Sequence, residues 1–152
     1  MTTKARNKDK RFGIQDQIKV ATWNVRGLQH KESELERELK EREIDIAIIS
    51  ETKKKQRGSY DLKHYTVFYS GVDKTERAQA GVAILINNNL RNLITSYQWI
   101  NQRIIEIRCK IPRGNLTIIG VYAPEEGRKE ETIILYQQLQ NIINQTNKND
   151  YL

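Results

Sequence analysis

One stretch of the sequence decides the fold, residues 18–27, which read Ile-Lys-Val-Ala-Thr-Trp-Asn-Val-Arg-Gly. Ile, Val and Thr recur at every second position from 18 to 22, and this period of two predicts a buried strand over residues 18–24. Gly27 can adopt the positive φ angle that other residues resist, so a turn is expected to follow the strand. Asn24 then lies at the carboxyl end of the strand, with its amide oxygen free to face outward. Because ligands of open α/β sheets bind beyond this end of the strands, Asn24 is a candidate site residue.

A second strand is predicted over residues 44–52, where Ile-Asp-Ile-Ala-Ile-Ile-Ser-Glu-Thr is a nearly continuous apolar run. Between the two strands lies a charged helix, predicted over residues 31–43. Its thin apolar stripe consists of Leu28, Leu35 and Leu39. A strand, a helix of this length and another strand make a unit with parallel strands, whose carboxyl ends share one edge of the sheet. Asn24 and Glu51 are therefore expected to be neighbours.

The rest of the chain is richer in strands. Residues 53–63 are interpreted as a basic loop. Turn residues separate five further strands, predicted over residues 64–70, 80–86, 93–100, 103–111 and 115–122. Their close spacing predicts an antiparallel meander on one side of the strand–helix–strand unit. A helix with an apolar face is predicted over residues 129–147, and a strand barely begins after it, which indicates the start of a second crossover.

Composition limits the class of protein. The chain has 152 residues, enough for one domain or part of one, and 38% of them are hydrophobic, well above a disordered composition. The lone Cys109 excludes an internal disulfide and favours a reducing compartment, the nucleus or the cytoplasm. No apolar run approaches the roughly 20 residues needed to span a bilayer, and the N-terminus does not read as a secretory signal. We therefore expect an intracellular protein without a membrane partner.

The charge is concentrated near the N-terminus. The net charge of the chain is +7, and residues 1–19 hold six basic and two acidic residues, a net charge of +4. Residues 1–17 contain little to bury and are predicted to be a basic disordered tail, with residues 18–152 as part of a domain. A basic tail suits a polyanionic partner, although it could equally be a solvated extension.

Three polar residues are expected at carboxyl ends of strands: Asn24, Glu51 and Tyr122. Mg²⁺ prefers oxygen ligands and is often held by one or two carboxylates, with water and phosphate completing its shell. Glu51 can supply the carboxylate, and Asn24 can orient a second oxygen or hold the phosphate. The Tyr122 phenol can donate a hydrogen bond to charge that develops on a phosphoryl oxygen. These residue types suit metal-assisted attack on a phosphate ester, with Mg²⁺, or Mn²⁺ in its place, as the cofactor.

Four short motifs follow one another along the chain: Thr-Trp-Asn-Val-Arg-Gly at 22–27, Ser-Glu-Thr at 50–52, Ala-Gly-Val-Ala-Ile-Leu at 80–85 and Val-Tyr-Ala-Pro at 121–124. In this order they resemble successive motifs of the endonuclease/exonuclease/phosphatase family. Residues 122–132 are especially similar to the apurinic-type endonuclease domain of non-LTR retrotransposons, including the craniofacial-development-protein-like sequences derived from such elements. The resemblance extends over residues 18–152.

The resemblance implies a fold and an activity. The fold is an α/β sandwich of two sheets with helices outside, of which residues 18–152 form the N-terminal part. The activity is a Mg²⁺-dependent phosphodiesterase that nicks target DNA to prime reverse transcription, with a reverse transcriptase domain on the same chain. The resemblance makes Glu51 and Asn24 metal ligands, and makes Tyr122 and Asn24 catalytic. The family's Gly-Asp-Phe-Asn strand and later Asp-His pair would follow Leu152, so this chain alone is expected to be inactive.

A basic loop directly follows Glu51 and would overhang the site, where it could hold DNA phosphates. The candidate nucleic-acid contacts are Arg26, Lys53, Lys54, Lys55, Arg57 and Arg77. Each candidate has an ordinary structural alternative. Such a loop is most often solvated, Asn24 could simply stabilise its own turn, and Tyr122 could be a core residue with a bonded hydroxyl.

Two other functions agree with the same observations. One is a non-catalytic nucleic-acid-binding remnant of a mobile element. The other keeps the fold and changes the substrate from DNA to RNA or a lipid. The positive charge and the N-terminal sequence argue against an extracellular lipid enzyme, and they leave RNA open.

Overall fold

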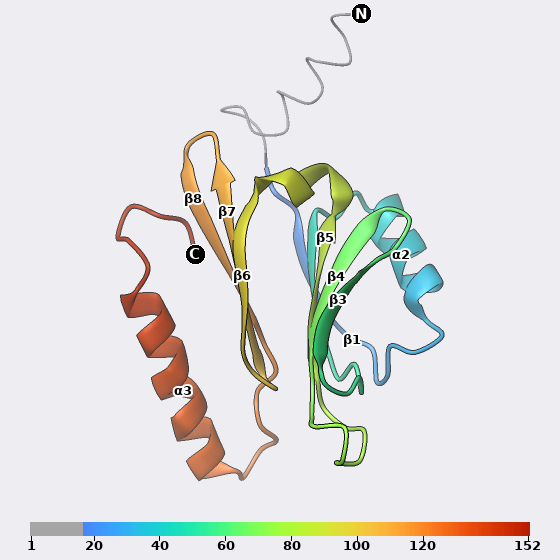
Figure 1. The fold of residues 1–152 in the computed structure, drawn as a ribbon, viewed down its shortest axis with the longest axis vertical. Helices are drawn as coiled ribbons and strands as arrows, with labels where there is room; N and C mark the ends of the chain where they lie inside the picture. The colour runs from blue at the N-terminus through green and yellow to red at the C-terminus, as the bar shows by residue number, and fades with distance from the viewer. Residues whose placement is uncertain (1–16) are drawn as a thin grey trace, which may run out of the picture.

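The computed structural model describes residues 17–152 (Figure 1). The tail predicted over residues 1–17 lies outside the described residues, apart from Gln17. In chain order the elements are β1 Val20–Asn24, α2 Glu32–Glu41, β2 Ile46–Ser50, β3 Arg57–Asp61, β4 Tyr65–Ser70, β5 Val82–Asn87, the 3₁₀ helix η1 Asn88–Leu93, β6 Ile94–Asn101, β7 Ile104–Ile111, β8 Gly114–Val121 and α3 Lys129–Asn144. Among residues 17–152, no helix is long and apolar enough to cross a membrane.

The strands form two sheets that face one another, with α2 outside one sheet and α3 outside the other (Figure 1). The first sheet has the order β1-β2-β5-β4-β3, and the second has the order β6-β7-β8. One apolar cluster, which includes Ile84 and Ile107, fills the space between the sheets. Two further clusters lie under α2 and α3. The predicted two-sheet α/β sandwich is thereby confirmed.

The first strand–helix–strand unit forms as predicted, with one difference. β1 and β2 are parallel, Asn24 is paired with Ser50, and the three leucines of the predicted stripe are buried. The prediction that β1 is a buried strand is wrong: Val20 is 58% exposed. Among the described residues β1 pairs only with β2, at the edge of the sheet. The alternating pattern predicted the strand correctly, but it did not predict that the strand would be exposed.

The region read as a basic loop contains a strand. β3 pairs antiparallel with β4 at the edge of the first sheet, and its side chains alternate between exposed and half-buried. Because an edge strand buries little, its sequence Arg-Gly-Ser-Tyr-Asp is polar and carries no strong strand signal. The single meander predicted for the later strands is also wrong. β4 and β5 join the first sheet, and η1 leads the chain across to β6, β7 and β8 in the second.

The second crossover begins as predicted. After α3 the chain returns to β8, where Tyr151 makes a parallel bridge with Leu116. The Tyr151 N–H donates to the carbonyl of Asn115 and its carbonyl accepts from the N–H of Thr117, both at 2.9 Å. α3 ends at Asn144, three residues before the predicted end. An apolar face with Leu135, Leu139, Ile142 and Ile143 was predicted for this helix, and Ile143 is exposed.

Candidate functional site

The segments that follow β1, β2 and β8 lie at the same end of the molecule, the lower end in Figure 1. Gly120 of β8 allows this arrangement, since a Cβ atom there would come within 2.8 Å of Ile84 Cγ1 on β5. The two sheets can therefore approach closely just before Tyr122. The negative charge of Glu51 acts on the Tyr122 phenol and raises its pKa, so two candidate residues that are 71 positions apart come together across the sheets.

Asn24 lies beside this pair at the end of β1, and its side chain is exposed. Its amide oxygen is not free, because Oδ1 accepts a hydrogen bond of 3.2 Å from the backbone N–H of Arg26. This Asx turn is the ordinary structural role that the residue type allows. An amide oxygen has two lone pairs, so the turn still leaves an acceptor position for a ligand.

Glu51 sits in a strained backbone. Its φ angle is 55°, and the φ angles of Lys53 and Ala80 are also positive, at 55° and 51°. Left-handed conformations cost non-glycine residues about 1–3 kcal/mol each, and they persist only where the surroundings enforce them. Here the Glu51 carbonyl accepts from the Gly27 N–H at 2.7 Å, and the Lys53 N–H donates to the Ala80 carbonyl at 2.8 Å. Such strain is common at functional sites, which agrees with a role for Glu51.

The Tyr122 phenol is held in its protonated form. Burial is the main cause that raises its pKa, and the negative charges of Glu51 and Glu125 raise the pKa further, while Arg103 opposes them. A protonated phenol can donate a hydrogen bond at neutral pH, which is the property that stabilisation of a phosphoryl oxygen requires.

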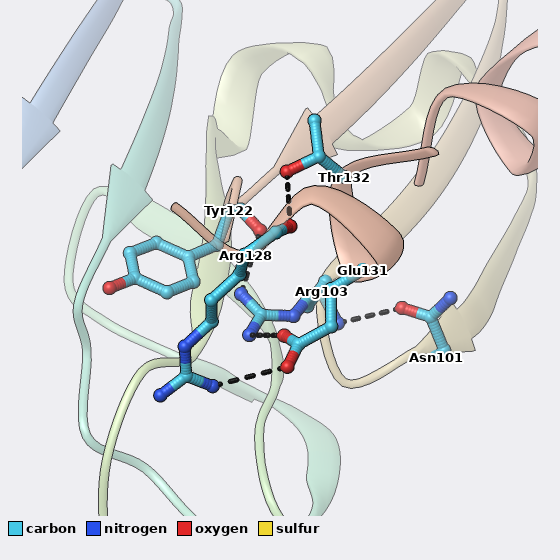
Figure 2. A network of polar contacts seen from close by, with 6 residues as sticks. All are labelled: Asn101, Arg103, Tyr122, Arg128, Glu131 and Thr132. Carbon is cyan, nitrogen blue, oxygen red and sulfur yellow. Dashed lines mark hydrogen bonds and ion pairs between the residues drawn. The ribbon is translucent and has the colours of Figure 1, made fainter. Parts of the chain in front are cut away.

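Sequence reasoning missed Arg103, whose guanidinium contacts Tyr122 (Figure 2). Its guanidinium donates to the Tyr122 carbonyl at 3.3 Å and to Glu131 Oε2 at 3.3 Å. A signal for this contact was present. The β7–β8 turn pairs Ile111 with Gly114, and the same register carried to the other end of the hairpin places Arg103 opposite Tyr122.

Most of the predicted nucleic-acid contacts border one hollow of about 660 Å³ beside the Glu51 loop. Its basic lining residues are Arg26, Lys31, Lys53, Lys54 and Lys55. Lys31 was not predicted. Arg57 borders a separate hollow of about 490 Å³ between the β4 end and the β6–β7 hairpin, and Arg77 is exposed in the loop before β5.

Lys54 has a structural role that the sequence did not indicate. Its ammonium group lies 4.8 Å from the ring centroid of Tyr60, 5.2 Å from that of Tyr69 and 3.8 Å from Glu32 Oε1. These contacts tie the loop after β2 to α2, β3 and β4. Lys54 is half-buried, whereas the other basic lining residues of the hollow are exposed.

The donor set at this edge suits a hard cation that keeps water and phosphate ligands. Glu51 offers a carboxylate and Asn24 an amide oxygen, and a Mg²⁺ site commonly needs only one or two carboxylates from the protein. Within residues 17–152, no three His, Cys, Asp or Glu side chains gather as a metal site. Glu51 and Asn24 thus fit as part of the coordination shell of a Mg²⁺ ion, with other ligands completing the shell.

Comparison with known proteins agrees with this arrangement. The model of the endonuclease/exonuclease/phosphatase family matches residues 21–149. Craniofacial development protein 2 of Bos taurus is 34% identical over 135 residues, which are 88% of this chain and 22% of that protein. The RNA-directed DNA polymerase from mobile element jockey of Drosophila melanogaster is 24% identical over 115 residues, 75% of this chain and 12% of that protein. The chain thus spans less than a quarter of the length of these relatives.

Solved structures share the fold over about half of their length. The endonuclease domain of TRAS1, a telomere-specific non-LTR retrotransposon, has a TM-score of 0.63 and 16% identity, over 88% of this chain and 57% of that one. An AP endonuclease from Archaeoglobus fulgidus has a TM-score of 0.61 and 20% identity, over 86% of this chain and 53% of that one. Fold, motif order and sequence similarity lead to one conclusion: the chain belongs to the endonuclease/exonuclease/phosphatase family.

Proposed function

We propose that this chain supplies one half of the site of a divalent-metal-dependent DNA endonuclease. The observation that carries the proposal is that Glu51 and Tyr122, from different sheets, are near enough for the Glu51 charge to raise the Tyr122 pKa, next to Asn24. A carboxylate, an amide and a protonated phenol at one edge are suited to bind a cation and a phosphate together.

Each residue has a distinct role in this proposal. Glu51 binds the metal ion, and Asn24 orients a ligand of the ion or a phosphate oxygen. Tyr122 donates to the phosphoryl oxygen on which negative charge develops. The ion, Mg²⁺ or Mn²⁺, supplies Lewis acidity at the phosphate when it is bound.

The basic hollow beside Glu51 supports nucleic acid as the substrate, because Lys and Arg side chains contact phosphates independently of sequence. Two proteins of similar structure were solved with DNA: a 3′ phosphatase from Neisseria bound to a product DNA hairpin, and TDP2 of D. rerio complexed with single-strand DNA product. The jockey and TRAS1 similarities support a more specific role, which is target-site nicking for a mobile element in the nucleus or cytoplasm. A reverse transcriptase domain on the same longer chain belongs to this proposal.

We further propose that residues 1–152 do not nick DNA alone. The chain spans 53% of the AP endonuclease from Archaeoglobus fulgidus and 57% of the TRAS1 endonuclease domain, and Glu51 is the one carboxylate proposed here as a metal ligand. Catalytic residues that act as a unit are strongly non-additive, so half a site should retain almost no activity.

The test is nicking of supercoiled plasmid with Mg²⁺ by residues 1–152 and by a longer chain that spans the whole domain. We expect the longer chain alone to nick, and Glu51→Ala in it to reduce the rate by about 10³-fold or more. Glu126→Ala, an exposed carboxylate in the segment after Tyr122, is the matched control and should nick normally. RNA and phosphoinositide substrates in parallel assays distinguish the substrate classes.

The main alternative is a non-catalytic nucleic-acid-binding protein. The observation that favours it is the basic hollow beside Glu51, which suits phosphate contacts whether or not the protein cleaves the nucleic acid. It predicts that the longer chain binds DNA without nicking it at any Mg²⁺ or Mn²⁺ concentration. That result would contradict the endonuclease proposal.

A further inference from the structure

We infer that Arg103 is a positioning residue for Tyr122, and that Glu131 of α3 holds it in place. The inference rests on the proposed function, since it explains how Tyr122 is held in place beside Glu51. It concerns side chains from β7 and α3, outside the motifs that the sequence suggested.

Arg103 contacts Tyr122 through both its backbone and its side chain. The Tyr122 N–H donates to the Arg103 carbonyl at 2.9 Å, which extends the β7–β8 ladder by one pair. The guanidinium donates to the Tyr122 carbonyl at 3.3 Å, and its central carbon lies 5.4 Å from the centroid of the ring. Arg103 thus restrains the main chain of Tyr122 and covers its ring at the same time.

Glu131 lies in the first turn of α3 and fixes the other side of the guanidinium (Figure 2). Its Oε2 accepts from Arg103 at 3.3 Å, while its Oε1 accepts from Arg128 at 3.2 Å. The backbone N–H of Arg103 also donates to Asn101 Oδ1 at 2.8 Å, which closes the β6–β7 turn. Arg103 therefore connects α3 to the ring of Tyr122.

The burial of Arg103 separates this role from contact with a phosphate. Its side chain is only 19% exposed, and its donors are directed at Tyr122 and Glu131. Within residues 17–152 the cation–π contact with the Tyr122 ring comes from Arg103, whereas Arg128, which shares Glu131, is 54% exposed. A planar guanidinium can satisfy a carbonyl, a carboxylate and a ring face together, whereas a lysine ammonium cannot.

The first experiment needs no activity. Residues 1–152 are labelled with 3-fluorotyrosine, and the ¹⁹F signal of Tyr122 among the seven tyrosines is assigned by its loss in Tyr122→Phe. We expect Arg103→Gln to shift or broaden the Tyr122 signal more than any other. Arg128→Gln is the matched control and should leave the Tyr122 signal in place. An unchanged Tyr122 signal in Arg103→Gln would overturn the inference.

Folding of the variants is read from the same spectrum, because the remaining tyrosines are distributed over both sheets and α3. If Arg103→Gln alters all signals, Glu131→Gln is used, which leaves the arginine in place and removes its charged partner. A smaller shift confined to Tyr122 is then expected, and a Tyr122 signal identical to wild type would contradict the coupling to α3.

The second experiment is a double-mutant cycle in the longer chain that nicks plasmid. Arg103→Gln should lower kcat by about tenfold to a hundredfold with KM nearly unchanged, since a small misplacement of a catalytic group has effects of this size. In a Tyr122→Phe background the same substitution should have almost no effect on kcat. Additive effects, or a loss expressed in KM, would assign Arg103 to DNA binding and overturn the inference. Absence of nicking by the wild type would instead contradict the proposed function and leave the ¹⁹F result to decide the role of Arg103.

Discussion

The two segments that carry Glu51 and Tyr122 are held in place by different means. The β2 loop, residues 51–56, is fixed by backbone hydrogen bonds to three neighbouring segments, and it contains several positive φ angles. The β8 segment, residues 122–128, is fixed largely by side chains, through Arg103 and its ion pair with Glu131.

This difference teaches where each half of the site can tolerate change. The backbone hydrogen bonds of the β2 loop, at strained φ angles, require particular neighbouring residues, especially glycines. Replacement of those glycines should therefore strongly reduce the free energy of unfolding. Partly exposed ion pairs each contribute little to stability. Substitutions in the β8 segment should therefore displace the Tyr122 side chain before they reduce the stability of the fold. The predictions below, from the largest expected effect to the smallest, test this contrast.

The largest effect is expected at Gly71, which follows β4. A Cβ atom there would overlap with the carbonyl oxygen of Lys54 in the β2 loop. Because backbone cannot move aside as a side chain can, Gly71→Ala should reduce the free energy of unfolding by about 3 kcal/mol or more. Gly127→Ala in the β8 segment is the control. A Cβ there meets nothing within 4 Å, and its positive φ of 92° should cost only about 1–2 kcal/mol. Urea unfolding measures the free energy of unfolding of both variants. Equal losses in the two variants would show that the β2 loop and the β8 segment do not differ in this way.

Nucleic-acid affinity should also differ between the segments. Lys53 of the β2 loop borders the basic hollow, whereas Arg128 of the β8 segment is paired with Glu131. We expect Lys53→Gln to lower DNA affinity about tenfold at low salt and to reduce the slope of log K against log salt by about 0.9. Arg128→Gln should change both quantities much less. Fluorescence anisotropy over a salt series provides the measurement, and an affinity that is independent of salt would argue against phosphate contacts in the hollow.

A smaller effect of opposite sign is expected from relief of strain. Lys53 has a φ of 55°, so Lys53→Gly should raise the free energy of unfolding by about 0.5–1 kcal/mol once the entropy cost of glycine is included. Lys110→Gly, at an exposed position inside β7, is the control and should lower it. If Lys53→Gly is less stable than wild type, the side chain of Lys53 contributes more than its backbone strain costs.

The smallest effect on stability is expected in the β8 segment. Glu131 is 47% exposed and pairs with Arg103 and Arg128, so Glu131→Gln should cost less than about 1 kcal/mol. The loss should shrink further in high salt, because exposed charges are screened. Thermal unfolding at two salt concentrations measures it. A loss as large as that of Gly71→Ala would show that side chains hold the β8 segment as firmly as backbone holds the β2 loop.

Much of the fold follows from local patterns in the sequence. The alternation before Asn24, the apolar run before Glu51 and the charged helix between them predicted a parallel pair, because a crossover of that length permits no simpler arrangement. The same reasoning placed Asn24 and Glu51 at one edge. The expected end of a strand identified Tyr122 as a candidate. The family motifs predicted the two-sheet sandwich, which the fold confirms.

Tertiary structure alone decided the rest. Period-two alternation shows which residues share a face, but not which sheet a strand joins, so the division of the later strands between two sheets was hidden. β3 was missed because an edge strand buries little apolar surface, so its sequence lacks the apolar pattern that predicts a strand. The Asn24 oxygen was expected to be free, with a bond inside its own turn as the alternative, and the structure shows that local bond to the Arg26 N–H. The hairpin register could place Arg103 opposite Tyr122, but its pairing with Glu131 of α3, 28 positions away, depends on tertiary packing rather than on local pattern.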